Sequence, residues 1–149
     1  MGISKRVLLY CIGGAGYVAL EWLWRGWSHS SMFLAGGSCF LLLGKLDNQR
    51  PKLPLLLRGV VGAGIITMVE LLAGLLFNRD YRVWDYRHLP MNYHGQICLP
   101  FFLLWIPLSL FAMGLHRLLD RSLHKRRPKA SEQAGAWPPA PPWLPSGRR

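Results

Sequence analysis

Residues 53–77 read LPLLLRGVVGAGIITMVELLAGLLF, and this stretch decides the class of the fold. Arg58 and Glu70 are its only ionisable side chains. A helix needs about 20 predominantly apolar residues to cross the hydrocarbon core of a bilayer. Pro54 near the start suits the first turn of a helix. We therefore predict a membrane-spanning helix over residues 53–77.

Three further apolar stretches flank this helix. The second stretch along the chain is the weakest, because the small residues 35–38 dilute its hydrophobicity, and we expect neighbouring helices to shield its middle. Pro107 is compatible with a helix in lipid, where neighbouring groups satisfy the freed backbone. The predicted fold is an all-α integral membrane protein, a bundle of four transmembrane helices over residues 7–24, 27–43, 53–77 and 97–115.

The composition supports a membrane protein over a soluble domain. Hydrophobic residues make up 51% of the chain and charged residues only 17%, against about 25% in soluble domains. The net charge of +11 lies at the ends of the apolar stretches. This placement favours anionic lipid as the partner and argues against nucleic acid.

The positions of lysine and arginine predict the orientation of the bundle. Of the 18 such residues, four precede or follow the predicted outer ends of the helices: Arg25, Arg79, Arg82 and Arg87. The others lie near the N-terminus, around the second gap and after the last helix. The excess of positive charge predicts cytoplasmic termini in a multi-pass protein of the cell membrane, with the loop at 78–96 outside.

The chain after the last predicted span divides into two parts. Leu115, Leu118, Leu119 and Leu123 fall on one face at helical spacing, opposite basic residues, which predicts an interfacial helix that contacts anionic lipid. This helix completes a transmembrane domain over residues 1–123. The basic, proline-rich residues 124–149 predict a disordered cytoplasmic tail.

Two acidic residues lie inside the predicted spans, and each needs an explanation because a carboxylate in hydrocarbon is costly. Glu21 lies near the end of the first span and Glu70 near the end of the third, so both come to a similar depth under the loop. Either they form a polar site for a cation, a proton or a lipid headgroup, or they pair with nearby arginines. Glu21 and Arg25 have the i, i+4 spacing that favours an ion pair.

The predicted outer loop combines aromatic and polar residues at high density. Aromatic rings with carboxylates can enclose an organic cation, whereas arginines with backbone amides can hold a phosphate. With the two glutamates, the loop supplies the candidate substrate-binding residues: Glu21, Glu70, Trp84, Asp85, Tyr86, Asn92 and His94.

Several chemical functions have little support in the sequence. The chain contains no GxxxxGK[ST], GxSxG or HExxH motif, and its three cysteines lack metal-ligand spacing. We expect no enzyme activity, no metal and no cofactor. The remaining enzymatic alternative is a membrane enzyme acting on lipid, with Asp85 and His94 as acid and base.

The segment VELLAGLLFNRDYRVWDYRHLPMNYHGQICLPFFLLWIPL resembles the CmpB-type membrane proteins, the type IV ABC-transporter family. The likeness covers roughly residues 7–115. Family members often have a serine after WDY, whereas this chain has Arg87. The residues that match the family pattern are Glu70, Leu71, Gly74, Trp84, Asp85, Tyr86, Asn92, Gly95 and Trp105.

The resemblance implies a bundle of four or more membrane helices with a permease role. Four helices form a narrow bundle, so a transport pathway would need a homodimer or a separate ATPase subunit. Two alternatives remain open. One is a small proton-coupled exporter of organic cations that uses Glu21, and the other is a non-transporting protein that binds lipid or scaffolds partners through its C-terminal region.

Overall fold

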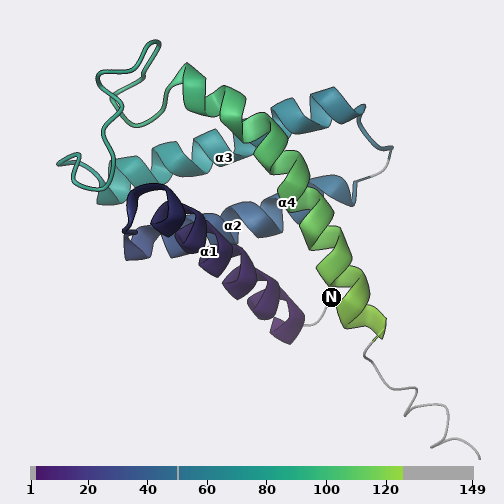
Figure 1. Ribbon diagram of the computed structural model, residues 1–149. Helices are drawn as coiled ribbons and strands as arrows, with labels where there is room; N and C mark the ends of the chain where they lie inside the picture. Colours follow the sequence, from purple (N-terminus) through teal and green to yellow (C-terminus); the bar gives the residue numbers. More distant parts are fainter. Residues whose placement is uncertain (1–2, 50, 126–149) are drawn as a thin grey trace, which may run out of the picture.

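A computed structural model describes residues 3–49 and 51–125 of the chain. Within this part the structure consists of four helices and no strand, which confirms the all-α class (Figure 1). The long loop of residues 78–98 joins the last two helices and contains one isolated β-bridge, between Tyr93 and Ile97. The helices are α1 (Ile3–Arg25), α2 (Ser30–Asp47), α3 (Leu55–Phe77) and α4 (Leu99–Lys125).

The helices coincide with the four predicted apolar stretches, but α4 is longer than predicted. It continues through Pro107 and ends at Lys125. The segment predicted as a separate interfacial helix is therefore the last part of α4. Of the predicted tail, residues 126–149 lie outside the described residues.

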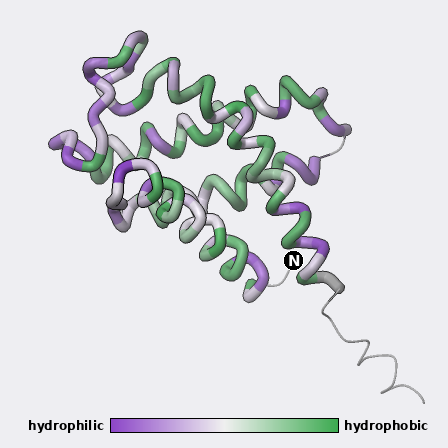
Figure 2. The backbone as a smooth tube through the Cα atoms, in the orientation of Figure 1, coloured by the Kyte–Doolittle hydropathy of each residue, from purple (hydrophilic) through white to green (hydrophobic). Residues whose placement is uncertain are grey.

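Three of the helices are long and apolar enough to cross a membrane: α1, α3 and residues 99–123 of α4. Figure 2 shows hydrophobic residues along these helices and hydrophilic ones in the loops and at the helix ends. These spans make the chain a membrane protein. Helix α2 is not among them, so a fourth crossing is not established.

Helix α2 lies at the centre of the packing. Its buried residues form cores with α3 and α4 around Leu43 and Ile66, and with α3 and the loop around Met32 and Trp84. The small residues that lower its hydrophobicity allow close approach: a Cβ atom added at Gly36 would lie 2.4 Å from Cβ of Tyr17 on α1. The prediction that neighbours shield its middle is confirmed.

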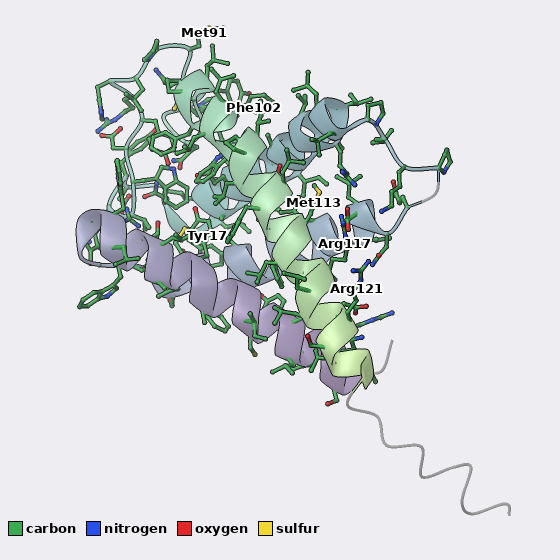
Figure 3. The ribbon with its side chains drawn as sticks, turned by 45° about the vertical axis from the view of Figure 1, so that its right-hand side comes forward. Tyr17, Met91, Phe102, Met113, Arg117 and Arg121 are labelled. Carbon is green, nitrogen blue, oxygen red and sulfur yellow. The ribbon has the colours of Figure 1, made fainter. Side chains whose placement is uncertain are left out.

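The arrangement leaves a gap on one side of the bundle. Helix α1 packs on α2, and α3 packs on α4, but in the described part of the chain no Cα atom of α1 lies within 8 Å of a Cα atom of α3. Helices α1 and α4 converge where Nζ of Lys5 lies 2.8 Å from Oδ1 of Asp120, and they diverge toward the loop (Figures 1 and 3). We call the end that carries residues 78–98 the loop end, and the other the Asp47 end.

Candidate functional site

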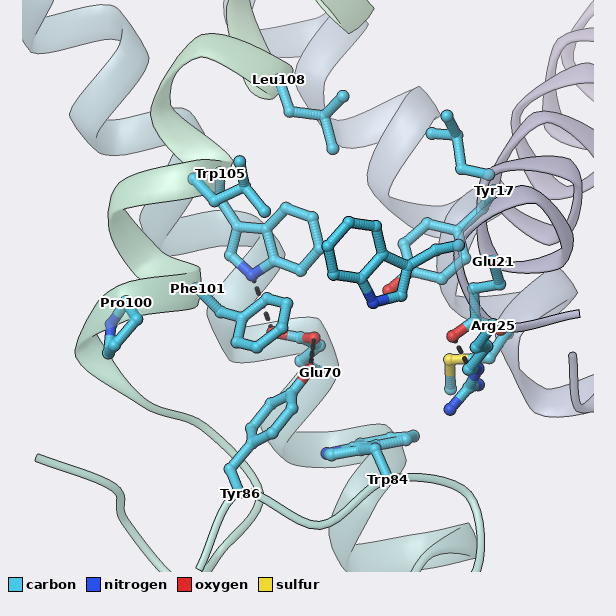
Figure 4. Close-up of a pocket in the computed structure, with 14 residues that line it drawn as sticks. Tyr17, Glu21, Arg25, Glu70, Trp84, Tyr86, Pro100, Phe101, Trp105 and Leu108 are labelled. Atoms are coloured by element: carbon cyan, nitrogen blue, oxygen red, sulfur yellow. Dashed lines mark hydrogen bonds and ion pairs between the residues drawn. The ribbon is translucent and has the colours of Figure 1, made fainter. Parts of the chain in front are cut away.

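Glu70 is the buried acid of the loop end. It lies on α3 two turns before Phe77 and is only 5% exposed. Indole Nε1 of Trp105, on α4, donates a hydrogen bond of 2.8 Å to Oε2, and the hydroxyl of Tyr86, from the loop, donates one of 3.4 Å to Oε1. Both carboxyl oxygens thus have a hydrogen-bond partner, and three elements meet at this side chain (Figure 4).

These partners bring hydrogen bonds but no positive charge. Burial, and next the charge of Glu70, raise the pKa of Tyr86 well above its ordinary value, so its hydroxyl remains a neutral donor. No lysine, arginine or histidine of the described residues forms an ion pair with Glu70. A carboxylate in a membrane interior is stable only with a compensating charge or a proton. Glu70 can therefore accept either a cation or a proton.

Glu21 has a different environment. Arg25 Nη2 donates to its Oε1 at 2.7 Å with i, i+4 spacing, and Ser28 Oγ donates to Oε2 at 2.6 Å. Another nitrogen of Arg25, Nη1, donates to the carbonyl of Val83 in the loop. Of the two explanations for this acid, the ion pair with Arg25 is the one that the structure contains. The pair also ties the end of α1 to the loop.

A cavity of about 550 Å³ connects the two glutamates. It opens in the gap between α1 and α4, and Glu70 lies on the side opposite α1 (Figure 4). A volume of this size is typical of small-molecule sites, which span about 300–1,000 Å³. Its lining is largely aromatic and aliphatic: Tyr17, Leu20, Glu21, Trp24, Arg25, Met32, Glu70, Trp84, Tyr86, Pro100, Phe101, Leu104, Trp105 and Leu108.

The loop is held over the cavity by a buried pair of amide side chains. Nδ2 of Asn78 donates to Gln96 Oε1 at 3.0 Å, and Nε2 of Gln96 returns a bond of 3.0 Å to the carbonyl of Asn78. Asn78 also donates to the carbonyl of Trp84 at 2.7 Å, and the Trp84 indole donates to the carbonyl of Gln96 at 2.9 Å. Because Trp84 both accepts and donates in this network, the network fixes Trp84 as a wall of the cavity.

Aromatic stacking fixes the position of the Tyr86 ring. The ring lies nearly parallel to that of Phe101, with centroids 4.6 Å apart. Phe101 in turn contacts Trp105 on the next turn of α4, at a centroid distance of 5.9 Å. The two donors to Glu70 are therefore positioned by packing that does not involve the carboxyl group itself.

The seven predicted site residues fall into two groups. Glu21, Glu70, Trp84 and Tyr86 line the cavity together. Asp85, Asn92 and His94 do not line it, and their predicted role in binding stays a prediction.

Asp85 and Asn92 have local partners in the loop. Asp85 faces away and pairs with Arg87, whose Nη2 lies 2.7 Å from Oδ2. Hydrogen bonds from Arg87 lower the pKa of Asp85 to about 2. Asn92 donates to the carbonyl of Leu89 at 2.9 Å and accepts from the backbone N–H of Gly95 at 3.3 Å, so it closes a turn. The side chain of His94 is exposed.

Most of the lining residues were absent from the predicted site, among them Tyr17, Phe101 and Trp105. Trp105 belongs to the motif that carries the family resemblance, and an indole N–H inside an apolar helix needs an acceptor. The need of the Trp105 indole for an acceptor could therefore have predicted its hydrogen bond with Glu70. Tyr17 and Phe101 carried no comparable signal, because aromatic residues are ordinary in membrane helices.

The Asp47 end holds a second buried acid, which was not among the predicted site residues. Asp47 is the last residue of α2 and is 4% exposed. Arg117 of α4 donates to both of its oxygens, at 2.7 and 2.6 Å, and Arg58 of α3 donates to Oδ1 at 2.9 Å. This cluster joins three helices and compensates the acid fully.

A comparison with models of protein families identifies the family of the chain. The model of the family described as "Putative ABC-transporter type IV" matches residues 8–135, most of the chain. No curated protein and no solved structure matches the chain. The match includes Glu70, Trp105 and the whole loop, so the cavity falls within the family's shared region. The chain belongs to the type IV ABC-transporter family, and it is a transporter-like membrane protein.

Proposed function

We propose that this protein is the membrane-embedded, permease-like subunit of a transporter, and that the cavity at Glu70 binds a cationic group of the substrate. The observation that carries the proposal is the environment of Glu70. Its carboxyl group is buried, accepts hydrogen bonds from two neutral donors and has no cation beside it in the described part of the chain. A bound cation would supply the missing charge.

The aromatic lining favours an organic cation over a metal ion. Trp84, Tyr86, Phe101 and Trp105 surround the carboxyl group, and ring faces attract ammonium groups. Metal ions need several oxygen, nitrogen or sulfur ligands, and the described residues contain no group of three histidine, cysteine, aspartate or glutamate side chains placed to hold one. The neutral donors keep the carboxyl group oriented while they leave its charge available.

The orientation proposed for transport follows from the lysine and arginine counts, with both termini in the cytoplasm and the loop end outside. It requires an even number of crossings, so the proposal includes α2 as a fourth span beside α1, α3 and α4. In this orientation the cavity lies in the outer half of the bundle. The gap between α1 and α4 means that the described part of one chain does not enclose a pathway. We propose that a second copy or a separate ATPase subunit completes it.

Binding of radiolabelled tetraethylammonium to the purified protein in lipid nanodiscs tests the site. We expect saturable binding that falls at least about tenfold in Glu70→Gln, because the amide keeps the hydrogen bond from Trp105 but removes the charge. Asp80→Asn, which removes an exposed carboxylate outside the cavity, is the matched control and should bind normally. Equal binding by Glu70→Gln and the wild type would contradict the proposed site.

Uptake into membrane vesicles tests the transport role separately. Vesicles from host cells with the wild-type protein should accumulate the same cation on addition of ATP, and vesicles with Glu70→Gln should not. Comparable amounts of both proteins in the vesicles, measured by immunoblot, control for expression. Binding without any accumulation above protein-free vesicles would leave a cation-binding membrane protein and would contradict the permease role.

A further inference from the structure

A second cavity extends the site along the bundle. It has a volume of about 260 Å³ and shares Tyr17, Leu20 and Leu108 with the first cavity. It runs along the gap between α1 and α4 toward the Asp47 end, over a floor from α2 and α3 that includes Cys39, Leu43 and Ile66. The two cavities thus form one groove, which we call the α1–α4 groove.

The two parts of this groove differ in chemistry. The part near the loop end contains the two glutamates and Arg25, and Arg25 is already paired with Glu21. Around the second cavity, Tyr17 and Cys39 are the only lining residues with polar side-chain atoms, and the others are apolar or glycine. The groove therefore has one uncompensated acid at one end and a hydrocarbon-like lining beyond it.

The mouth of the groove faces the side of the bundle where no helix closes it. Leu20 and Trp24 of α1 and Leu104 of α4 line the first cavity and are 50%, 84% and 54% exposed. Helices α1 and α4 are two of the three candidate membrane spans. In a bilayer these side chains face lipid, so the groove opens sideways into the hydrocarbon layer.

We infer that the α1–α4 groove binds a single-chain amphiphilic cation, with its ammonium head at Glu70 and its alkyl tail along the second cavity. The inference rests on the proposed function of Glu70 and names the class of substrate. Charge complementarity selects the head, because of the two acids that line the groove Glu21 is paired with Arg25 and Glu70 has no cation beside it. The apolar lining selects the tail, and the lateral opening gives such a molecule access from the membrane.

The glycines of the bundle provide a matched pair of variants. Gly16 lines the second cavity on α1, and a Cβ atom added there meets no atom within 4 Å. Gly64 on α3 is equally open but lines neither cavity. Both are exposed helical positions. We therefore expect Gly16→Leu to occupy part of the tail site, with no clash at its Cβ atom, and Gly64→Leu to add the same side chain elsewhere.

The test uses a dodecyltrimethylammonium analogue with a photoreactive diazirine at the end of its tail. The full-length protein in lipid nanodiscs is illuminated with this probe, and the adducts are mapped by mass spectrometry. We expect adducts on residues 12–20 and 108–115. Labelling should fall about tenfold in Gly16→Leu, since each excluded methylene group reduces affinity by about fourfold. Gly64→Leu should label as the wild type does.

The outcomes separate this inference from the proposed function. Tetraethylammonium binding that depends on Glu70, combined with tail labelling that Gly16→Leu does not reduce, would overturn the tail site and leave the cation site intact. Equal labelling by a dodecanol analogue would overturn the cationic occupant. If Glu70→Gln bound tetraethylammonium and was labelled by the dodecyltrimethylammonium analogue as the wild type is, the proposed function itself would be contradicted.

Discussion

The two ends of the bundle each bury an acid, but only one of the two acids has arginine side chains beside it. At the Asp47 end, two arginines from different helices compensate the carboxylate of Asp47. At the loop end, Glu70 receives only neutral donors and lies beside a cavity of about 550 Å³. Both groups are about equally buried. Burial alone therefore does not distinguish a structural acid from a binding site, whereas the charge of the neighbours does.

The compensated acid should matter most for stability. Asp47→Ala leaves Arg58 and Arg117 without their partner, and breaking a buried pair in this way costs about 3 kcal/mol or more. We expect a large drop in the midpoint of thermal unfolding of the detergent-solubilised protein. Glu70→Gln should change the free energy of unfolding by about 1 kcal/mol or less, because the amide oxygen still accepts from Trp105. A larger loss of stability in Glu70→Gln than in Asp47→Ala would show that Glu70, not Asp47, is the acid on which the fold depends.

The next largest effect should come from the contact between α3 and the loop. A Cβ atom added at Gly74 would lie 2.3 Å from Oε1 of Gln96, so Gly74→Ala should displace the amide pair and cost about 1–3 kcal/mol. The walls of the cavity move with the loop, and cation binding should weaken as well. Gly64→Ala, which meets no atom within 4 Å, is the control. Unchanged stability and binding in Gly74→Ala would show that the network of Asn78 and Gln96 does not hold the loop.

The Asp47 end should also be the more sensitive to acid. Burial alone raises the pKa of Asp47, but the hydrogen bonds and charge of Arg117, with the charge of Arg58, outweigh it and hold the pKa below its ordinary value. Because the pKa of Asp47 is lower in the folded state, its ionised carboxylate contributes fully to stability above the unfolded pKa of about 3.9. This contribution is lost as the pH falls through the pKa that Asp47 has in the folded protein. The unfolding midpoint of the wild type should fall more steeply below about pH 4 than that of Asp47→Asn. Parallel curves would contradict this assignment.

The smallest effect should come from the exposed ion pair of the loop. Asp85 pairs with Arg87 outside the cavity, and pairs in such positions contribute little because water and salt screen them. Asp85→Asn should leave both the unfolding midpoint and tetraethylammonium binding unchanged. A clear loss of binding would bring Asp85 into the site, as its sequence context predicted, and would shift the site toward the loop.

Much of the fold was predictable because hydrophobic stretches of sufficient length leave few alternatives. The four helices lie where the apolar stretches lie, and the low hydrophobicity of residues 35–38 correctly indicated a shielded helix. The continuation of α4 past Leu115 was not predicted, since a basic amphipathic stretch is compatible with a separate interfacial helix as well as with a longer α4. The importance of Asp47 was missed because Arg117 lies 70 residues away in sequence.

The order of the residues along the chain is enough to predict that the chain spans a membrane, that Glu70 needs an explanation and that the loop between the last two helices lies close to it. Apolar length, isolated charge and chain connectivity are local properties, and each can be read from neighbouring residues. The i, i+4 spacing already favoured a cation beside Glu21, whereas the neutral surroundings of Glu70 became visible only in the folded chain. Arg25 reaches Glu21 within one helix, while the partners of Glu70 come from α4 and the loop. The groove between α1 and α4 was likewise beyond the sequence, because it results from the angle at which two distant helices diverge.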